Sequence, residues 1–251
     1  MATTKVRYNQ IKTGLPAGGD ANYNDVSLLL KMEGSDGSTT FADGSSSGHS
    51  ITANGNASIS TSEFKFGSSS AYFDGSGDYL SAPSGISPSG TDDFTVEYWI
   101  YVPSAPSNYT VLFANATSGG LAMTVHSDGT IRYGKSLIGV DGSSSNTINF
   151  DAWNHIVLTR ESGTVYIFIN GSQGYSASNT SSYNAGILVI GADGNYSSFP
   201  YTGYIDEFRI TKGIARYTSN FSVPTAAFPA FESKEGKELR VGANGTIELE
   251  S

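Results

Sequence analysis

The stretch Gly203-Tyr-Ile-Asp-Glu-Phe-Arg-Ile210, followed by Thr-Lys-Gly-Ile-Ala-Arg-Tyr-Thr-Ser-Asn-Phe and running on to Pro229, says more about the fold than any other part of the chain. Its first eight residues are rich in aromatic and β-branched side chains, which favour a strand. A segment containing Gly and Pro follows, which is typical of a turn. The stretch therefore predicts a strand from Gly203 to Ile210 that closes a series of strands, and then an irregular exit segment.

The clearest of the earlier strands is Phe94–Val102, with the sequence FTVEYWIYV. Successive side chains of a strand point to opposite faces of the sheet. One face of this strand is apolar and is predicted to line the core: Phe94, Val96, Tyr98, Ile100 and Val102. The other face mixes aromatic and polar groups, as a concave, partly wetted face does: Thr95, Glu97, Trp99 and Tyr101.

Short predicted strands separated by Gly, Ser and Asp turns follow one another along most of the chain. No run of helical periodicity interrupts them between Ser27 and Ile210, so the strand–helix alternation of Rossmann and TIM folds is absent. The pattern indicates an all-β sandwich or barrel. The remaining predicted strands are Ser27–Met32, Ile51–Ser60, Phe64–Phe73, Asp78–Ala82, Thr110–Ala114, Leu121–His126, Thr130–Gly134, Trp153–Arg160, Thr164–Asn170 and Gly186–Gly191.

Composition excludes several classes of protein. The 251 residues contain no cysteine, which excludes a disulfide framework and thiolate metal sites. The formal net charge of −9 argues against a nucleic-acid partner, because such proteins need a basic face. No apolar run approaches the roughly 20 residues of a membrane span, so we expect no membrane insertion.

The two ends of the chain differ from the middle. Residues 1–24 are predicted to be an arm, with a basic start and a Gly-rich loop. Residues 231–251 are predicted to be a charged linker and a short hairpin, Leu239–Leu249, with Asn244-Gly245 at turn positions that need positive φ. A lone hairpin is marginally stable in water, so we expect it to pack against something. Residues 25–230 between them are predicted to be one sandwich domain.

Three segments carry a resemblance to a known family. They are Phe66-Gly-Ser-Ser-Ser-Ala-Tyr-Phe-Asp-Gly75 leading into Asp78-Tyr79, Asp93-Phe-Thr-Val-Glu-Tyr-Trp-Ile100, and Trp153-Asn-His-Ile-Val-Leu-Thr159 followed by Val165-Tyr-Ile-Phe-Ile-Asn-Gly171. In order and spacing they resemble the concanavalin A-like, laminin-G-like superfamily. The resemblance implies a jelly-roll sandwich of two antiparallel sheets, in which the first and the closing strands lie side by side. The version of the closing segment with Ala215-Arg-Tyr-Thr218 resembles copies in bacteriophage virion proteins.

The same resemblance implies a structural calcium ion, as many relatives hold one near the closing strand. Carried over, its ligands are backbone oxygens near Glu33 and Gly67 and the side chain of Asp206, since calcium takes backbone and carboxylate oxygens. An alternative cluster would use Asp74 and Asp78. The competing interpretation is that Asp206 caps a turn by hydrogen bonding.

Aromatic residues suggest two candidate ligand surfaces. Aromatic rings stack on the apolar faces of sugars, so a carbohydrate platform is predicted on the partly wetted sheet face; its residues are Trp99, Tyr101, Tyr166 and Phe168. The competing interpretation is that loops cover this face and make these side chains a second layer of core. A second aromatic set is predicted to form a protein contact rim: Tyr109, Tyr183, Tyr196, Phe199 and Tyr201.

Catalytic patterns are missing. The Glu-x-Asp-x-x-Glu arrangement of related glucanases does not occur, and the adjacent Asp206 and Glu207 point to opposite faces of a strand, so they cannot act as an acid–nucleophile pair. The histidines His49, His126 and His155 are scattered and form no metal-binding motif. Arg209 and Arg216 are assigned to surface pairing. We therefore expect no enzymatic activity, with a β-glucanase as a remote alternative.

These observations predict a non-catalytic structural and binding module. The phage-like resemblance favours a virion protein that attaches to other virion proteins or to a cell-surface glycan, as a homo-oligomer, with a trimer among the options. The alternative is a cellular or secreted, calcium-dependent, lectin-like domain, which would be extracellular.

Overall fold

The computed structural model describes residues 5–6, 19–135, 139–193, 199–231, 239–241 and 247–249. The chain divides into two compact units. One is residues 24–228, and the other combines residues 1–23 with residues 229–251. Each unit is considered separately below.

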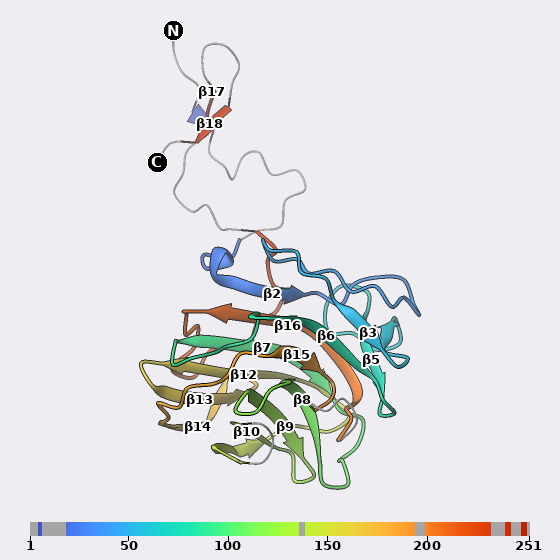
Figure 1. Ribbon diagram of the computed structural model, residues 1–251. Helices are drawn as coiled ribbons and strands as arrows, with labels where there is room; N and C mark the ends of the chain where they lie inside the picture. The colour runs from blue at the N-terminus through green and yellow to red at the C-terminus, as the bar shows by residue number, and fades with distance from the viewer. Residues whose placement is uncertain are drawn as a thin grey trace. The chain divides into compact units, whose positions relative to one another are not determined.

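The larger unit is a sandwich of two antiparallel sheets, which confirms the predicted fold class (Figure 1). The seven-stranded sheet has the order β11 (Gly142–Thr147), β10 (Thr130–Lys135), β9 (Leu121–His126), β8 (Tyr109–Asn115), β15 (Ile187–Ile190), β6 (Tyr79–Ser84) and β3 (Thr52–Asn54). The eight-stranded sheet has the order β14 (Ser172–Ser178), β13 (Thr164–Ile169), β12 (Trp153–Glu161), β7 (Phe94–Tyr101), β16 (Thr202–Lys212), β5 (Ser70–Asp74) and β4 (Ser58–Ser60), and β2 (Val26–Leu30) pairs with β16 outside this order.

The closing strand β16 organises the eight-stranded sheet. Its 11 residues pair with β5 near the start and with β2 near the end, where Phe208 lies opposite Leu30. The first and the last strands of the sandwich therefore lie side by side, as predicted. The register against β7 shifts between Asp206 and Arg209, and Glu207 has a φ of 51°. Because of this bulge both carboxylates lie on the outer face, Asp206 opposite the outward-facing Trp99 and Glu207 hydrogen-bonded to Phe228 N of the segment after β16. The prediction that they point to opposite faces is therefore wrong.

The core lies between the two sheets and uses one face of each strand. The predicted inward face of Phe94–Val102, which comprises β7 and the residue after it, is confirmed, because its five apolar residues are all buried in the main core cluster. The Tyr98 ring stacks on Phe208 with 5.0 Å between ring centroids, so β7 and β16 are joined by ring packing as well as by backbone hydrogen bonds.

Residues 213–228, here called the strap, follow β16 and cover part of the outer face of the eight-stranded sheet. The Phe221 ring lies 5.4 Å from Phe168 and 5.8 Å from His155, and Phe228 lies 6.3 Å from His155. The strap is held by a hydrogen bond from Phe228 N to Glu207 Oε2 at 2.7 Å. The predicted irregular exit segment is thus a second layer of packing on the sheet.

The smaller unit contains a sheet of three strands in the order β1 (Lys5–Val6), β17 (Leu239–Val241) and β18 (Ile247–Leu249). Antiparallel pairing of β17 with β18 confirms the predicted hairpin, while its turn lies outside the described residues. The partner of the hairpin is the N-terminal arm, with Lys5 opposite Arg240. A separate finding is that no helix in the described part of the chain is long and apolar enough to cross a membrane.

Candidate functional site

A buried ionic cluster lies on the outer face of the eight-stranded sheet, beneath the strap. Its centre is Glu97 on β7, which accepts hydrogen bonds from Arg209 Nη2 at 2.7 Å and Arg209 Nε at 3.0 Å. The Tyr217 hydroxyl donates to the other oxygen of Glu97 at 3.1 Å. Both Glu97 and Arg209 are buried. The assignment of Arg209 and Arg216 to the surface is wrong, because the strap buries the first and leaves only 9% of the second side chain exposed.

The positive charges around Glu97 offset the cost of burying its carboxylate. Burial alone would raise the pKa of this carboxyl, but the charge of Arg209 opposes it, with further contributions from His155 and Arg216. The resulting pKa is about 2. Glu97 is therefore an ionised structural partner of arginine and has no access to a substrate.

The predicted metal ligand Asp206 faces a loop that follows β4. Its Oδ2 atom accepts hydrogen bonds from Lys65 N at 2.9 Å and Phe66 N at 3.0 Å, and Oδ1 accepts one from Glu207 N at 2.8 Å. Burial raises the pKa of Asp206 to about 7, partly offset by these hydrogen bonds, and the charge of Glu33 raises it further. Asp206 thus positions the loop by hydrogen bonding.

The structure brings Glu33 and Gly67 to this same loop. The Glu33 carboxylate accepts hydrogen bonds from Ser68 N at 3.1 Å and Ser68 Oγ at 2.9 Å. Gly67 has a φ of 68°, and a Cβ atom there would overlap Glu33 Oε1, so only glycine suits the position. The described residues hold no group of three or more His, Cys, Asp or Glu side chains that could bind a metal ion, and the Glu33 and Asp206 carboxylates accept hydrogen bonds from loop or strand atoms. The calcium ion itself stays a prediction.

The alternative metal cluster is occupied by turn contacts. Asp78 is buried and accepts hydrogen bonds from Asn56 N at 2.7 Å and Asp74 N at 2.9 Å. Asp74 in turn accepts one from Ser76 N at 2.7 Å. These two carboxylates stabilise the turn between β5 and β6.

The four aromatic residues of the predicted sugar platform share the outer face of the eight-stranded sheet but not one open surface. Trp99 and Phe168 are buried, the first beside Phe66 at 5.6 Å and the second beneath the strap. Tyr101 and Tyr166 remain half-buried. Covering loops, which were the competing interpretation, therefore account for two of the four residues.

The second aromatic set is divided by the fold. Tyr183 and Tyr201 are core residues, and Tyr196 lies outside the described residues. Tyr109 and Phe199 do meet, as stacked rings with centroids 4.1 Å apart. Tyr109 also stacks on His126, its register partner on β9, at 5.1 Å.

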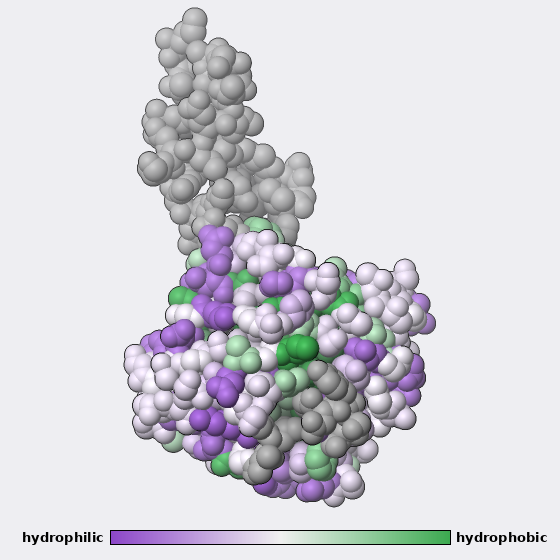
Figure 2. Space-filling view, in the orientation of Figure 1, coloured by the Kyte–Doolittle hydropathy of each residue, from purple (hydrophilic) through white to green (hydrophobic). Residues whose placement is uncertain are grey.

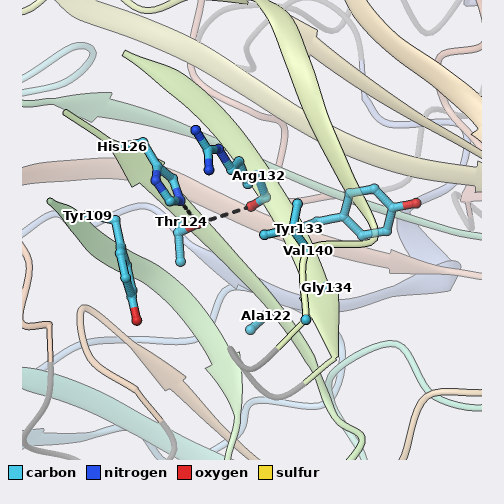
Figure 3. Close-up of a pocket in the computed structure, with 9 residues that line it drawn as sticks. Tyr109, Ala122, Thr124, His126, Arg132, Tyr133, Gly134 and Val140 are labelled. Atoms are coloured by element: carbon cyan, nitrogen blue, oxygen red, sulfur yellow. Dashed lines mark hydrogen bonds between the residues drawn. The ribbon is translucent and has the colours of Figure 1, made fainter. Parts of the chain in front are cut away.

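This aromatic stack forms one wall of a hollow on the outer face of the seven-stranded sheet (Figure 3). The hollow has a volume of about 70 Å³ and is lined by Tyr109, Ala122, Thr124, His126, Arg132, Tyr133, Gly134, Gly139 and Val140. Cross-strand register explains its small floor, because Thr124 lies opposite Arg132 and Ala122 lies opposite Gly134. Gly134 lets the backbone of Gly139 approach closely, since a Cβ atom at position 134 would overlap the Gly139 carbonyl oxygen.

Polar groups in the hollow are arranged for hydrogen bonding. Thr124 Oγ1 lies 3.2 Å from His126 Nε2 and donates to Arg132 O at 3.4 Å (Figure 3). Burial and the charge of Arg132 lower the pKa of His126, against a smaller opposing effect of Asp128, which favours the neutral imidazole. Arg132 pairs with Asp128 at 3.3 Å, and both side chains are partly exposed. The hollow therefore offers hydroxyl, imidazole and guanidinium groups with little net charge.

The edge of the hollow is unusually apolar for this surface. In the view of Figure 2 hydrophobic side chains are scattered among hydrophilic ones. The large hydrophobic residues that are most exposed in the described chain are Phe64, Val140, Ile187 and Phe199, and Val140, at 59%, is the most exposed of them. Val140 lines the hollow and Phe199 stacks on its wall, so two of the four belong to this place.

The sequence contained two usable signals for the hollow. Ala122, Thr124 and His126 alternate with the core residues of β9, which places them together on the outer face. The turn Ser127-Asp128-Gly129 between β9 and β10 is a hairpin signal, which predicts that Arg132 lies beside this strand, and the structure confirms the pairing. Nothing in the sequence shows that β8 brings Tyr109 to the other side, because that neighbour is set by the tertiary structure.

Comparisons with known proteins agree with this fold. The family model described as "Concanavalin A-like lectin/glucanases superfamily" matches residues 74–215. Domain 4 of an extracellular GH43 arabinanase from Geobacillus stearothermophilus, solved with arabinotriose, is 19% identical with a TM-score of 0.55, covering 75% of this chain and 92% of that one. The binding domain of Paraclostridial Mosquitocidal Protein 1 is 17% identical with a TM-score of 0.63, covering 77% and 50%.

The receptor-binding domain of botulinum neurotoxin type G is 16% identical with a TM-score of 0.55, covering 73% of this chain and 47% of that one. The chain thus spans about half the length of the two toxin domains. No curated protein matches the chain. Since the family model covers more than half of the residues, the chain belongs to the concanavalin A-like lectin/glucanases superfamily.

Proposed function

We propose that this protein is a non-catalytic binding module for glycans, and that the hollow on the seven-stranded sheet holds one sugar unit. The observation that carries the proposal is the composition of the hollow: a Tyr109 wall and an apolar Val140 edge beside Thr124 and Arg132. Sugars combine apolar C–H faces with hydroxyl groups, so they need an aromatic surface and hydrogen-bonding groups at the same place.

Two further observations support the proposal. The solved relatives include an arabinanase domain in complex with arabinotriose and receptor-binding domains of toxins, which sets an expectation of binding for this chain. The neighbouring carboxyl groups Asp206 and Glu207 are 0% and 1% exposed, and neither reaches a surface where a substrate would sit. A glycosidase needs two carboxyl groups on either side of an accessible bond.

Replacing Arg132 with alanine is expected to weaken binding to the preferred glycan by about tenfold to a hundredfold, because hydrogen bonds from charged groups contribute ~1.5–3 kcal/mol. A glycan array identifies the ligand, and isothermal calorimetry measures the loss. The matched control is Asp128→Asn, which removes the ion-pair partner and keeps the guanidinium. Equal affinity of wild type and Arg132→Ala would place the sugar elsewhere.

We further propose that the module works on a virion surface as an attachment protein, in an oligomer. The features behind this step are the phage-like segment Ala215–Thr218 and the terminal sheet, in which β1 and β18 each have only one partner among the described strands. Such edges are templates for pairing with another chain. The partners in this setting are other virion proteins or a cell-surface glycan.

Deleting residues 1–23 and 229–251 is expected to leave a folded monomer, because residues 24–228 form a compact unit with its own core. The full chain is expected to form an oligomer, with a mass of two or more times the 26.4 kDa of one chain. Size-exclusion chromatography with light scattering measures both. An oligomer of the truncated chain would assign assembly to the sandwich instead of the termini.

A further inference from the structure

Four aromatic side chains form a row across the eight-stranded sheet, whereas the hollow lies on the seven-stranded sheet. They come from four consecutive strands: Trp153 on β12, Tyr101 on β7, Tyr204 on β16 and Tyr72 on β5. Each is the direct register partner of the next, since Trp153 pairs with Tyr101, Tyr101 with Tyr204, and Tyr204 with Tyr72. Direct partners share a face, so all four point outward.

The rings follow one another at nearly constant spacing. Centroids are 5.8 Å apart for Trp153 and Tyr101, 5.9 Å for Tyr101 and Tyr204, and 5.0 Å for Tyr204 and Tyr72. Neighbouring strands are about 4.8 Å apart, so the three gaps give the row a length of about 14 Å. This length suits several linked sugar units and exceeds what a single sugar needs.

The row remains partly open, while the strap and the loop after β4 cover other parts of this sheet face. All four rings are half-buried, while Trp99, farther along β7, and Phe168, on the neighbouring strand β13, are buried. The strap packs its Phe221 ring on Phe168 and His155, which lie beyond the row. An aromatic row that the strap leaves half-exposed is a surface that a ligand can stack on.

We infer that this row is a second binding site, which takes a single neutral polysaccharide chain lying across the strands. The inference rests on the proposed glycan-binding function and extends it to an extended ligand. Sugar rings stacked on successive aromatic side chains would contact the row along its length, and the ligand's hydroxyl groups would remain in water.

Charge around the row selects against acidic chains. Asp151 accepts a hydrogen bond from the Tyr101 hydroxyl at 2.5 Å. The pKa of Tyr101 is raised mainly by this hydrogen bond, and that of Tyr204 mainly by burial. The charge of Glu63 makes a smaller contribution in the same direction to both tyrosines, so it also lies near the row. Two carboxylates beside the rings would repel uronic or sialic acid groups, whereas they accept hydrogen bonds from neutral sugar hydroxyls.

Ring orientation selects against flat ligands. The interplanar angles along the row are 59°, 79° and 40°. Rings tilted to this extent cannot lie flat together on the surface of a crystalline polysaccharide. A soluble chain, which can rotate about each glycosidic linkage, is able to follow them.

The test is affinity electrophoresis of the full chain in native gels that contain a soluble neutral polysaccharide, namely β-glucan, galactomannan or xylan, or the acidic polygalacturonate. We expect retardation by at least one neutral polymer and none by polygalacturonate. Tyr204→Ala and Trp153→Ala should each weaken binding about fivefold, the effect of losing ~1 kcal/mol of ring stacking. Tyr79→Ala is the matched control, a half-buried tyrosine on β6 of the other sheet, and should bind as wild type.

Oligosaccharides of the retarding polymer provide a second readout that a merely structural role of these tyrosines would not change. Calorimetry should show affinity rising with chain length up to about four units, the span of the row, and then levelling off. Row variants that bind as wild type, while Arg132→Ala does not, would overturn this inference and leave the proposed function intact. If no polysaccharide or glycan binds at all, both fall together.

Discussion

Arg209→Met is expected to lower the free energy of unfolding by about 3–5 kcal/mol, because it leaves Glu97 ionised and buried without its main partner. Glu97 would retain weaker interactions, among them the 3.5 Å contact with His155, the 3.7 Å contact with Arg216 and the Tyr217 hydrogen bond. Urea unfolding followed by tryptophan fluorescence measures the loss, since Trp99 lies on the same strand as Glu97.

A paired variant separates the ion pair from simple loss of packing. In Glu97→Met with Arg209→Met the buried carboxylate is removed as well, and Arg216 keeps its 2.7 Å hydrogen bond to Thr211 Oγ1, so the double variant should be more stable than Arg209→Met alone. The matched control is Arg132→Met, whose partner Asp128 is exposed, and it should cost less than about 1 kcal/mol. A cost for Arg209→Met as small as that of the control would mean that the strap does not bury this cluster in solution.

The free energy of unfolding is expected to be highest near pH 4–5 and to fall toward pH 8. Burial raises the pKa of Asp206 and of Glu207 to about 7 in the folded chain. Between their unfolded values near 4 and about 7 the folded state holds these protons more tightly, so stability is lost as the pH rises through this window. Glu97, with its pKa lowered to about 2, has the opposite effect and loses its contribution below about pH 4.

Denaturation at pH 5 and pH 8 measures this dependence. Asp206→Asn and Glu207→Gln should each flatten the decline between these two pH values, because an amide does not ionise. A wild-type stability that is equal at both pH values would show that these carboxyl groups are not buried as the structure has them.

Calcium is expected to offset the decrease in the free energy of unfolding at pH 8. At a concentration 100 times its Kd a ligand that binds only the folded state adds about 2.7 kcal/mol. Glu33→Gln and Asp206→Asn should remove this increase in stability. Glu207→Gln should retain it, because the Glu207 side chain contacts Phe228 and not the loop that follows β4. If calcium does not change the unfolding midpoint of EDTA-treated protein at any concentration, the predicted metal site is wrong.

The division between sequence and tertiary structure is clearest on the strands themselves. Alternation along β7 determined which face is core, because side chains of a strand alternate by geometry and only one of its faces was uniformly apolar. The turn residues and the absence of helical periodicity determined the all-β class, and the spacing of three segments pointed to the family. These are local properties, and each can be read within a few consecutive residues.

Three-dimensional packing decided which surfaces a ligand can reach. Trp99 and Tyr101 occupy equivalent places in the pattern of β7, yet Phe66 covers the first, and the second joins a row with rings from three other strands. The sequence placed Arg209 at the surface, whereas in the folded protein the strap buries it against Glu97. The alternation of residues in a strand determines the face on which a side chain lies. Whether that face is open depends on strand order and on segments distant in the chain, which pack on it only in the folded protein.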